Sequence, residues 1–370
     1  MENNEKRTVL SLSAPTDNEQ PLVKNTIYSI NEKDEDDKIA ESLSPDYLYT
    51  VSLTELYDTI YTPRTQVIDD LLCAGTYLFA GAPKVGKSFF MAQLAYHVSN
   101  GMDLWEYRVH EGTVLYLALE DDYSRLQKRL SKMFGMEEGT DKLRFATDAK
   151  HLGEGLDAQL EVFLKKHSDT KLIIIDTLQK IREMGGEQYS YASDYEIVTR
   201  LKTFSDKHNI CVLLVHHTRK QSAEDCFETI SGTNGLLGAA DGAFIMQKEK
   251  RTDVQATLDI VGRDQQDQRL HLFFERECCI WRLTKAETEL WKEAADPVLE
   301  AVANLLSEDV PQWTGSASEL SETLELTLQP NVLTRKLNVS VERLRNEHGI
   351  HYGSTRTHEG RKIELNRIEE

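Results

Sequence analysis

Eight consecutive residues of this chain have the types and the spacing needed to hold a phosphate group. They form the segment GAPKVGKS, which fits the pattern GxxxxGK[ST] at every fixed position. The glycines let the backbone wrap a phosphate, and the N–H groups of the loop point their dipoles at it. Lys87 would reach the β- and γ-phosphates of ATP, and Ser88 would ligate Mg²⁺. The predicted nucleotide contacts are Gly81, Ala82, Pro83, Lys84, Val85, Gly86, Lys87, Ser88 and Phe89.

Two carboxylates stand where apolar runs end. Asp176 closes the run KLIIIDT and would hold a water on the metal ion, although Asp176 or Thr177 could instead cap a helix. Glu120 closes TVLYLALE and would orient or deprotonate the attacking water. The alternative reading of Glu120, with Asp121 and Asp122 after it, is a solvated acidic turn.

A pair of histidines ends the run ICVLLVHH. His216 or His217 would sense the γ-phosphate through a hydrogen bond that depends on the nucleotide state. The alternative is a strand-end histidine whose hydrogen bonds are satisfied locally.

These residues need a sheet that brings strand ends together. Short apolar runs at 76–81, 113–120, 143–147, 171–177, 210–217 and 242–248 alternate with stretches of helical spacing. Strands buried on both faces have this composition, so the pattern predicts a mostly parallel sheet flanked by helices. Ligands of such sheets bind at the carboxyl ends of the strands, where the phosphate loop and both carboxylates fall.

The chain divides into three parts. Residues 1–50 are polar, with the charge run NEKDEDDKIAES, and are expected to be a disordered acidic tail. Residues 51–290 would form the α/β core, which opens with a short amphipathic helix at 51–60 and ends in three antiparallel edge strands after residue 250. Residues 296–370 read as helices followed by a hairpin, which predicts a small winged-helix-like domain.

The composition of the chain limits which ligands, membrane segments and cellular locations are expected. The net charge of −19 disfavours binding of phosphate polymers by the molecule as a whole, so nucleic-acid contacts must come from a local basic surface. No apolar run approaches the roughly 18 residues of a membrane helix, and the first residues lack a secretory h-region. Five cysteines without CxxC spacing indicate a reduced protein without structural zinc, and the expected location is cytoplasmic.

Five segments together resemble the RepA-like AAA family, which are RecA-type ATPases found with plasmids, phages and integrating elements. The segments are GAPKVGKS, VLYLALEDDYSRLQKRL, LIIIDTLQ, VLLVHHTRK and SGTNGLLGAADGAFIM, and they span about 75–285. The resemblance implies a RecA-like P-loop core and relatives that include hexameric replicative helicases. It also implies that Glu120 is the catalytic glutamate, that Asp176 is the Walker B aspartate, and that His216 and His217 form the γ-phosphate sensor region.

Hexameric relatives complete each site with an arginine from the neighbouring subunit. Arg263, in DIVGRDQQ, looks like that arginine finger, and an ordinary surface arginine is the alternative. Loops at 182–196 and 218–229 resemble in position the DNA-binding loops of RecA-type proteins. Each loop carries more acidic than basic residues, apart from Arg219 and Lys220. Three tyrosines of the first loop could stack on bases or pack locally: Tyr189, Tyr191 and Tyr195.

The C-terminal segment is the only part where the sign of the charge turns positive. Residues 331–370 contain eight Lys or Arg and six Asp or Glu. A basic helix followed by a basic hairpin suits phosphate contacts in a DNA groove, and the alternative is a protein-docking module with a solvated face. The predicted DNA-binding residues are Arg335, Lys336, Arg343, Arg345, Arg356, Arg361 and Lys362.

Three functions remain open from the sequence. The first is an ATP-driven DNA helicase or helicase-related replication ATPase of a mobile element or phage, assembled as a homo-oligomeric, hexameric ring, with replication proteins as further partners. The second is a DNA-bound nucleotide switch, an initiator or regulator without unwinding activity. The third is a small-molecule P-loop kinase, which the basic C-terminal module and the lack of an Arg-rich lid insertion disfavour.

Overall fold

The structure is a computed structural model that describes most of the chain beyond the N-terminal segment. The described residues are 48–137, 139–182, 191–218, 226–230, 234–263, 265–288, 290, 294–357 and 360–368. Several predictions lie outside these residues. They are the acidic tail over residues 1–47, most of the two loops expected to contact DNA, Tyr189, Arg219 and Lys220, and the side chains of Tyr191 and Arg356.

The core is one nine-stranded sheet in the order β11-β10-β9-β8-β3-β7-β6-β4-β5. Six neighbouring strands of this sheet are parallel: β8, β3, β7, β6, β4 and β5. Strands β9, β10 and β11 extend the sheet beyond β8 in antiparallel fashion. The predicted α/β class, with a mostly parallel sheet flanked by helices, is confirmed. The strands are β3 (Gly75–Gly81), β4 (Thr113–Ala118), β5 (Leu143–Ala146), β6 (Thr170–Asp176), β7 (Cys211–His217), β8 (Gly242–Gln247), β9 (Gln255–Gly262), β10 (Gln268–Glu275) and β11 (Ile280–Ala286).

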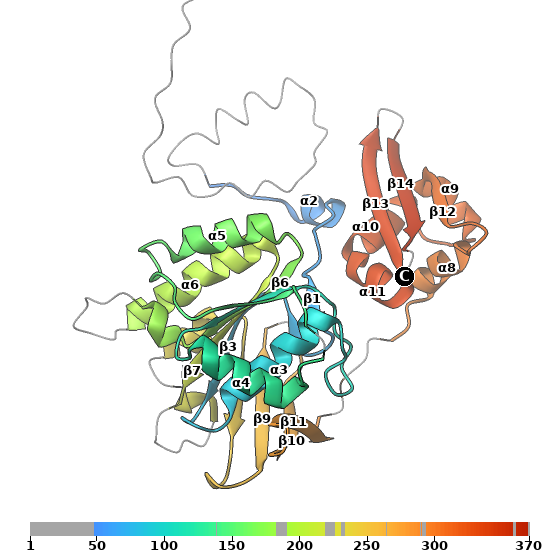
Figure 1. Ribbon diagram of the computed structural model, residues 1–370. Coiled ribbons are helices and arrows are strands. Elements are labelled where there is room, and N and C mark those ends of the chain that lie inside the picture. Colours follow the sequence, from blue (N-terminus) through green and yellow to red (C-terminus); the bar gives the residue numbers. More distant parts are fainter. Residues whose placement is uncertain are drawn as a thin grey trace, which may run out of the picture.

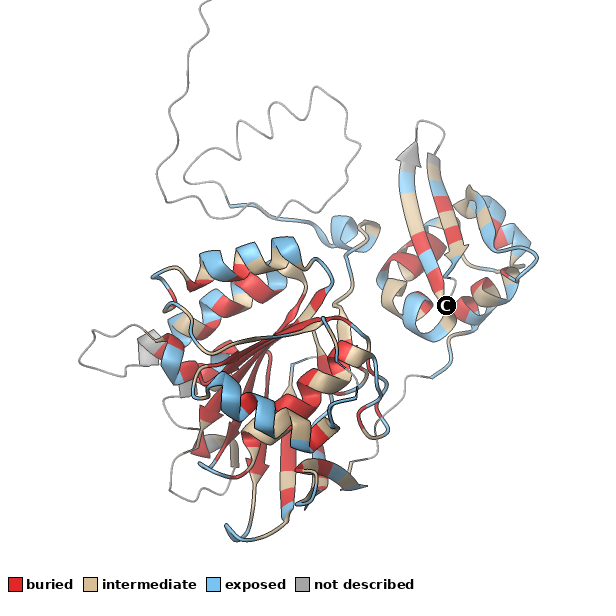
Figure 2. Ribbon diagram, viewed as in Figure 1, coloured by how far each residue is buried: buried red, intermediate tan, exposed pale blue. Residues whose placement is uncertain are grey.

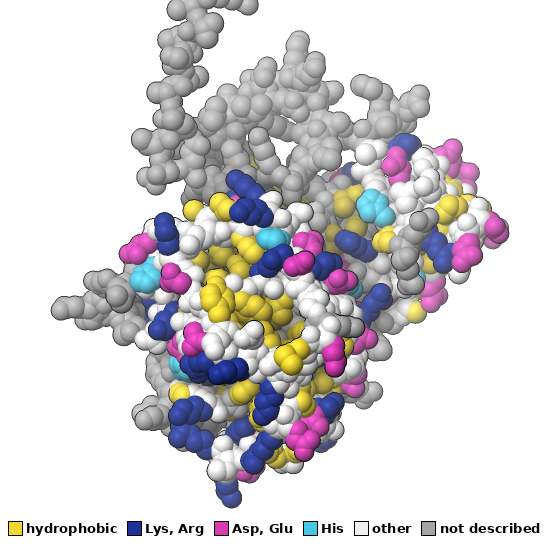
Figure 3. Space-filling view, in the orientation of Figure 1, with side chains coloured by type: hydrophobic (Ala, Val, Ile, Leu, Met, Phe, Trp, Pro, Cys, Tyr) yellow, Lys and Arg dark blue, Asp and Glu magenta, His cyan; other side chains and the backbone are white. Residues whose placement is uncertain are grey.

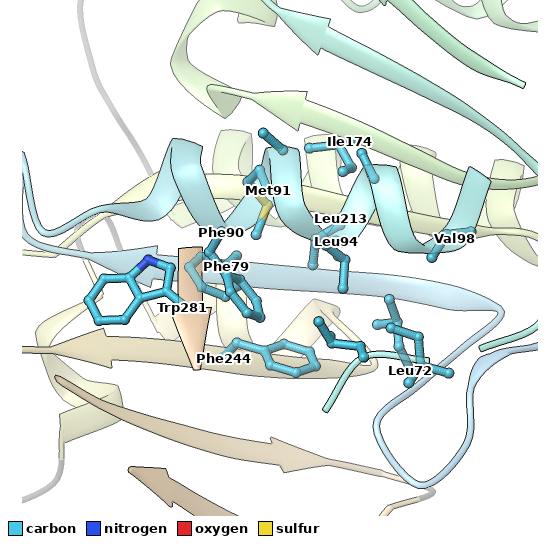
Figure 4. Close-up of a cluster of buried hydrophobic side chains, with 14 of the residues drawn as sticks. Leu72, Phe79, Phe90, Met91, Leu94, Val98, Ile174, Leu213, Phe244 and Trp281 are labelled. Carbon is cyan, nitrogen blue, oxygen red and sulfur yellow. The ribbon is translucent and has the colours of Figure 1, made fainter. Parts of the chain in front are cut away.

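Helices cover both faces of the sheet, as Figure 1 shows. The side chains of β3 alternate between two cores: Tyr77 and Phe79 join one, and Leu78 and Ala80 join the other. The first core lies under α3 and α4, where Phe79 packs against Phe90 and Phe244 (Figure 4), and the second lies under α5, α6 and α7. The central strands are therefore buried along their whole length (Figure 2). The helices are α3 (Lys87–Asn100), α4 (Tyr123–Phe134), α5 (Leu156–Lys166), α6 (Tyr191–His208) and α7 (Asn234–Ala239), with 3-10 turns at Leu178–Ile181 and Cys226–Thr229.

A short ribbon lies before the first core strand and was not predicted. It pairs β1 (Gln66–Ile68) with β2 (Leu72–Cys73), and it is too short to show periodicity in the sequence. Its residues Val67, Ile68, Leu71 and Leu72 are buried in the first core. The ribbon thus closes the first core near the start of β3.

The C-terminal part has its own hydrophobic core. Helix α8 (Pro297–Leu305) is followed by β12 (Gln312–Ser316), α9 (Ala317–Thr323), α10 (Pro330–Val339), α11 (Val341–His348), β13 (Ile350–Thr357) and β14 (Gly360–Arg367). The three strands form an antiparallel sheet in the order β12-β14-β13. Ser316 and Glu319 form a capping box that starts α9. The helices and the final hairpin follow the expected order, whereas β12 was not predicted, and the winged-helix assignment stays a prediction.

The helix predicted at 51–60 exists as α2 (Leu53–Asp58), but it does not pack on the core. No residue of α2 is buried, and its partner is α10 of the C-terminal part (Figure 1). The Asp58 carboxylate accepts a hydrogen bond from Arg335 at 2.9 Å, and the Tyr57 carbonyl accepts one from the Asn338 amide at 2.9 Å. These polar contacts, which a hydrophobic pattern does not predict, hold α2 against α10.

Across the described residues, no helix combines the length and the apolar character that a membrane crossing requires.

Candidate nucleotide-binding site

The phosphate loop joins β3 to α3 as predicted. Gly86 precedes the helix with φ 114°, and Lys84 also has a positive φ of 67°, so the loop curls tightly before the helix begins. A side chain at Gly81 would approach the Met246 carbonyl to 2.7 Å, because β3 and β8 are paired neighbours there. The space at both fixed glycines, and the backbone conformation at Gly86, thus exclude a larger residue.

Trp281, on β11, braces this loop from the antiparallel end of the sheet. A β-carbon added to Gly86 would come within 2.7 Å of the Trp281 ring, and the indole N–H donates to the Gly86 carbonyl at 3.3 Å. The Trp281 main chain is held in turn by the Gln93 side chain, which pairs with its N–H and its carbonyl at 2.9 Å each. Trp281 is fully buried, and Figure 4 places it beside the first turns of α3. The loop is therefore fixed to a strand nearly 200 residues away in sequence.

Lys87 is buried and all three of its ammonium hydrogens have acceptors. They are the Gly81 carbonyl at 2.7 Å, the Ala82 carbonyl at 3.1 Å and Nδ1 of His217 at 3.2 Å. Burial lowers the pKa of Lys87 to about 8, against the opposing pull of the Asp176 and Glu120 carboxylates. The cation is thus held at the loop, at the edge where the strands end.

Ser88 and Asp176 meet as predicted. The Ser88 hydroxyl donates to Oδ2 of Asp176 at 2.8 Å, and the Tyr116 hydroxyl donates to the same oxygen at 3.0 Å. Burial raises the pKa of Asp176, and the nearby Glu120 carboxylate raises it further. The two hydroxyl hydrogen bonds oppose that rise. A hydroxyl and a carboxylate are the hard oxygen ligands that Mg²⁺ prefers, so the residues present fit a magnesium ion.

Glu120 lies two residues beyond the end of β4, beside the end of β6. The two strands stay paired to that edge, since the Leu119 N–H donates to the Asp176 carbonyl at 2.8 Å. The Thr177 hydroxyl donates to Oε1 of Glu120 at 3.2 Å and orients the carboxylate. The next residue, Asp121, has a different role, because it pairs with Arg129 at 2.6 Å at the start of α4.

The two histidines have different surroundings. His217 lies beside Gly81 in the register of β3 and β7, whereas His216 lies beside Ala80 and is only 5 % exposed. Burial lowers the pKa of His217, and the Lys87 charge lowers it further. The neutral ring that results can accept the Lys87 hydrogen bond. His217 is therefore the member of the pair that reaches the phosphate loop.

Arg263 is not brought to this site within one chain. Strand β9 runs antiparallel to β8, with Gly262 opposite Gly242, so Arg263 follows β9 at the amino-terminal edge of the parallel strands. From Tyr77, opposite Gly242, to Gly81 is on the order of 13 Å of strand. The Arg263 guanidinium is exposed and donates to the Gly238 carbonyl at 2.8 Å.

The predicted DNA-binding cations of the C-terminal part mostly have carboxylate partners. Asp58 of α2 pairs with Arg335 at 2.9 Å and with Arg361 at 3.7 Å. The other pairs are Lys336 with Asp296 at 2.7 Å, Arg343 with Glu347 at 2.8 Å, and Lys362 with Glu364 at 2.8 Å. Arg345 is exposed, and it has no ion pair within the part of the chain that the structure describes.

The surface of the C-terminal part reflects this pairing. On the face drawn in Figure 3, its basic and acidic side chains are interspersed rather than gathered into one basic patch.

Four residues of the site do not belong to any sequence motif. Trp281 and Gln93 brace the loop, Tyr116 holds Asp176, and Lys248 stacks on the Trp281 ring with its nitrogen 5.1 Å from the ring centroid. Tyr116 lies in a strand that the sequence predicts to be buried. The polar hydroxyl within that apolar strand was the one feature of the sequence that could have indicated its role. The others come together only through the sheet order.

Comparison with known proteins gives one family match. A family model described as an AAA domain (AAA_25) matches residues 46–223. A search of curated proteins finds no match. Among solved structures, one of an ATPase domain is 14% identical, with 57% of this chain and 85% of that chain covered and a TM-score of 0.48.

Two further structures have similar values. A DnaB-like replicative helicase, solved with its interactions with primase, is 14% identical over 70% of this chain and 69% of that chain, at a TM-score of 0.48. A KaiC-like protein from Pyrococcus horikoshii is 13% identical over 57% and 90% of the two chains, at a TM-score of 0.39. The family match covers the phosphate loop, both carboxylates and the histidine pair. Residues 46–223 of this chain are therefore similar to the AAA domain family.

Proposed function

We propose that this chain hydrolyses ATP at the carboxyl edge of its parallel sheet. One observation carries the proposal: Lys87, Ser88, Asp176, Glu120 and His217 come from four separate segments and meet at this edge. A phosphate loop, a metal-binding pair and a carboxylate near it are the parts that ATP hydrolysis needs. A chance glycine turn would not be accompanied by the other three segments.

Each residue has a distinct task in this proposal. Lys87 exchanges its carbonyl acceptors for phosphate oxygens, and the loop N–H groups bind the same oxygens. Ser88 and Asp176 would hold Mg²⁺, which would supply positive charge beside the phosphate groups. Glu120, oriented by Thr177, positions a water and accepts its proton. His217 links Lys87 to β7, so its position follows the occupancy of the phosphate site.

The test of ATP hydrolysis is turnover by matched lysine variants. Lys87→Ala should lose turnover and nucleotide binding, because one buried cation and three hydrogen bonds are removed. Lys128→Ala, an exposed lysine of α4, is the control and should keep both. Wild-type turnover in Lys87→Ala would contradict the proposed site.

At a finer level, we propose a DNA helicase or helicase-related replication ATPase of a mobile element or phage, working as a hexameric ring. Two observations support it. The position of Arg263 at the opposite sheet edge suits a contact with the next subunit's nucleotide, and a separate C-terminal unit with a helix pair and a hairpin suits DNA. The second candidate is a DNA-bound nucleotide switch without unwinding, which the many internal ion pairs of the C-terminal cations favour.

One pair of measurements separates the two candidates. Mass measurement in ATP combined with a strand-displacement assay should find a ring that unwinds DNA. A monomer or dimer that binds DNA and hydrolyses ATP without unwinding would establish the switch instead.

A further inference from the structure

A polar groove lies at the edge of the sheet opposite to the candidate nucleotide site. Its volume is about 440 Å³, and its lining comes from the segments before β1, β6 and β7 and from α11 of the C-terminal part. Asn209 lies two residues before β7, and Thr170 begins β6, so the groove is at the amino edge of the parallel strands. The side chain of Gln66 donates to Glu342 at 3.0 Å and ties β1 to α11 beside it. Figure 1 shows α11 on the side of the core where β1 lies.

Three cations line this groove, although the whole chain carries a net charge of −19. They are Arg64, Lys171 and Arg345. Lys171 and Arg345 line the same groove. Burial lowers the pKa of Lys171 and the Arg345 charge lowers it further, whereas the Glu111 and Asp69 carboxylates oppose that fall. An anion bound between two neighbouring cations would reduce their electrostatic repulsion.

One carboxylate, that of Asp169, also lines the groove, and the acids near these cations have other partners. Asp169 accepts a hydrogen bond from the Thr113 hydroxyl at 2.8 Å, Asp69 pairs with His110 at 2.6 Å, and Glu111 pairs with Lys142 at 2.6 Å. Over the ranges that the structure covers, neither Lys171 nor Arg345 makes an ion pair with a carboxylate. Arg64 differs, since it lies 3.6 Å from the buried Asp241, which Lys202 also neutralises.

The rest of the lining indicates which ligand fits. It offers the polar side chains of Thr65, Ser168 and Asn346, and its one non-polar side chain is Pro63. No aromatic side chain on which a base could stack lines the groove as described, apart from the imidazoles of His110 and His208, which are paired with Asp69 and Glu161. Lysine and arginine with hydroxyl and amide donors, and without a stacking platform, suit the phosphate of a nucleic-acid backbone.

We propose that the groove between the amino edge of the sheet and α11 binds a backbone phosphate of DNA through Lys171 and Arg345. The affinity of the groove for phosphate does not depend on ATP hydrolysis. The choice of DNA as the source of that phosphate rests on the proposed function. A strand held there would contact the core and the C-terminal part at once.

The test measures binding of a fluorescein-labelled 30-nucleotide oligo(dT), and of the same length of duplex, by full-length protein without nucleotide. Lys171→Gln and Arg345→Gln should each weaken binding several-fold and lower the slope of log K against log salt by about one contact. Ser168→Glu, an exposed position in the groove, should weaken it as well. Arg345 and Ser168 are exposed, so these two variants test the groove even if Lys171→Gln impairs folding.

The control is Lys128→Gln, which removes one exposed lysine of α4, a helix that does not line the groove. Groove variants that bind oligonucleotide as well as this control would overturn the proposal. Millimolar pyrophosphate should displace the oligonucleotide from wild-type protein, because both ligands offer phosphate oxygens to the same cations. A different outcome would exclude DNA as the ligand. In that outcome pyrophosphate binds through Lys171 and Arg345, and oligonucleotide does not compete with it.

ATP turnover is measured in the same variants. It should be unchanged in Arg345→Gln and Ser168→Glu, since the groove lies at the other sheet edge. If wild-type protein binds oligonucleotide through the groove yet turns over no ATP, the ATPase proposal fails and the groove stands. If turnover is normal and groove variants match the control, the groove fails and the ATPase stands.

Discussion

At the residue scale, the fold changes the pKa of the Lys87 ammonium group. Its pKa is lowered to about 8 by burial, so the free protein loses this charge as the pH rises above that value. A bound triphosphate would favour the charged form and restore the pKa. Nucleotide binding at this site would therefore be linked to proton uptake above about pH 8.

We predict that nucleotide affinity falls as the pH rises above about 8, approaching tenfold per pH unit well beyond it. Calorimetry at pH 9 in buffers of different ionisation enthalpy should find close to one proton taken up per nucleotide bound. At pH 7, where the free protein already carries the charge, uptake should be near zero. Equal proton uptake at both pH values would contradict the assignment of the linkage to Lys87.

Glu120 allows a second prediction at this scale. Glu120→Gln should retain nucleotide binding and lose turnover by about 10²- to 10⁴-fold, because the amide cannot accept a proton from water. Asp122→Asn is the matched control: Asp122 caps α4 through the Arg125 N–H, and asparagine caps nearly as well. Turnover in Glu120→Gln equal to that control would show that another group handles the water.

At the element scale, the antiparallel strands do more than widen the sheet. Strand β11 carries Trp281 against the turn that begins α3, so the loop conformation depends on an edge strand added after the parallel sheet. The aromatic contacts of Trp281 with Phe274 and Lys248 hold the indole in place. The proposed nucleotide site is therefore built from both parts of the sheet.

Trp281→Phe should weaken nucleotide binding by about fivefold, which corresponds to one hydrogen bond of about 1 kcal/mol, with a small change in the free energy of unfolding. Trp281→Ala should also destabilise the fold by about 3–5 kcal/mol, because a fully buried side chain is removed. Trp313→Phe, in the C-terminal part, is the control for loss of an indole. Chemical denaturation and nucleotide titration measure the two effects separately, and unchanged affinity in Trp281→Phe would remove the bracing role.

At the scale of the whole molecule, the two edges of the sheet carry different groups. Lys87 lies at the carboxyl edge and Arg263 at the amino edge, so they can serve one nucleotide only if two subunits meet. The groove with Lys171 and Arg345 shares the amino edge with Arg263. A ring that stacks one edge against the next subunit would bring these groups near a neighbour's nucleotide.

Mixing two inactive variants tests this arrangement. Lys87→Ala and Arg263→Ala should each have low turnover alone, and a mixture should recover part of it. The reason is that some interfaces then pair an intact Lys87 from one subunit with an intact Arg263 from the other. Recovery should rise with protein concentration, whereas Lys87→Ala mixed with Lys87→Ala,Arg263→Ala should recover nothing. Arg263→Ala with full turnover by itself would remove the finger assignment.

The order of apolar runs and the motif at 81–88 were enough to predict the parallel sheet, its helices and the convergence of Lys87, Ser88, Asp176 and Glu120. This is because burial on both faces and loop geometry are local properties of the sequence. Only the tertiary structure decided that Trp281 braces Gly86, that His217 rather than His216 reaches Lys87, and that α2 lies on α10. Those contacts join segments far apart in the chain, and they depend on strand order, register and polar pairing, which no periodicity encodes.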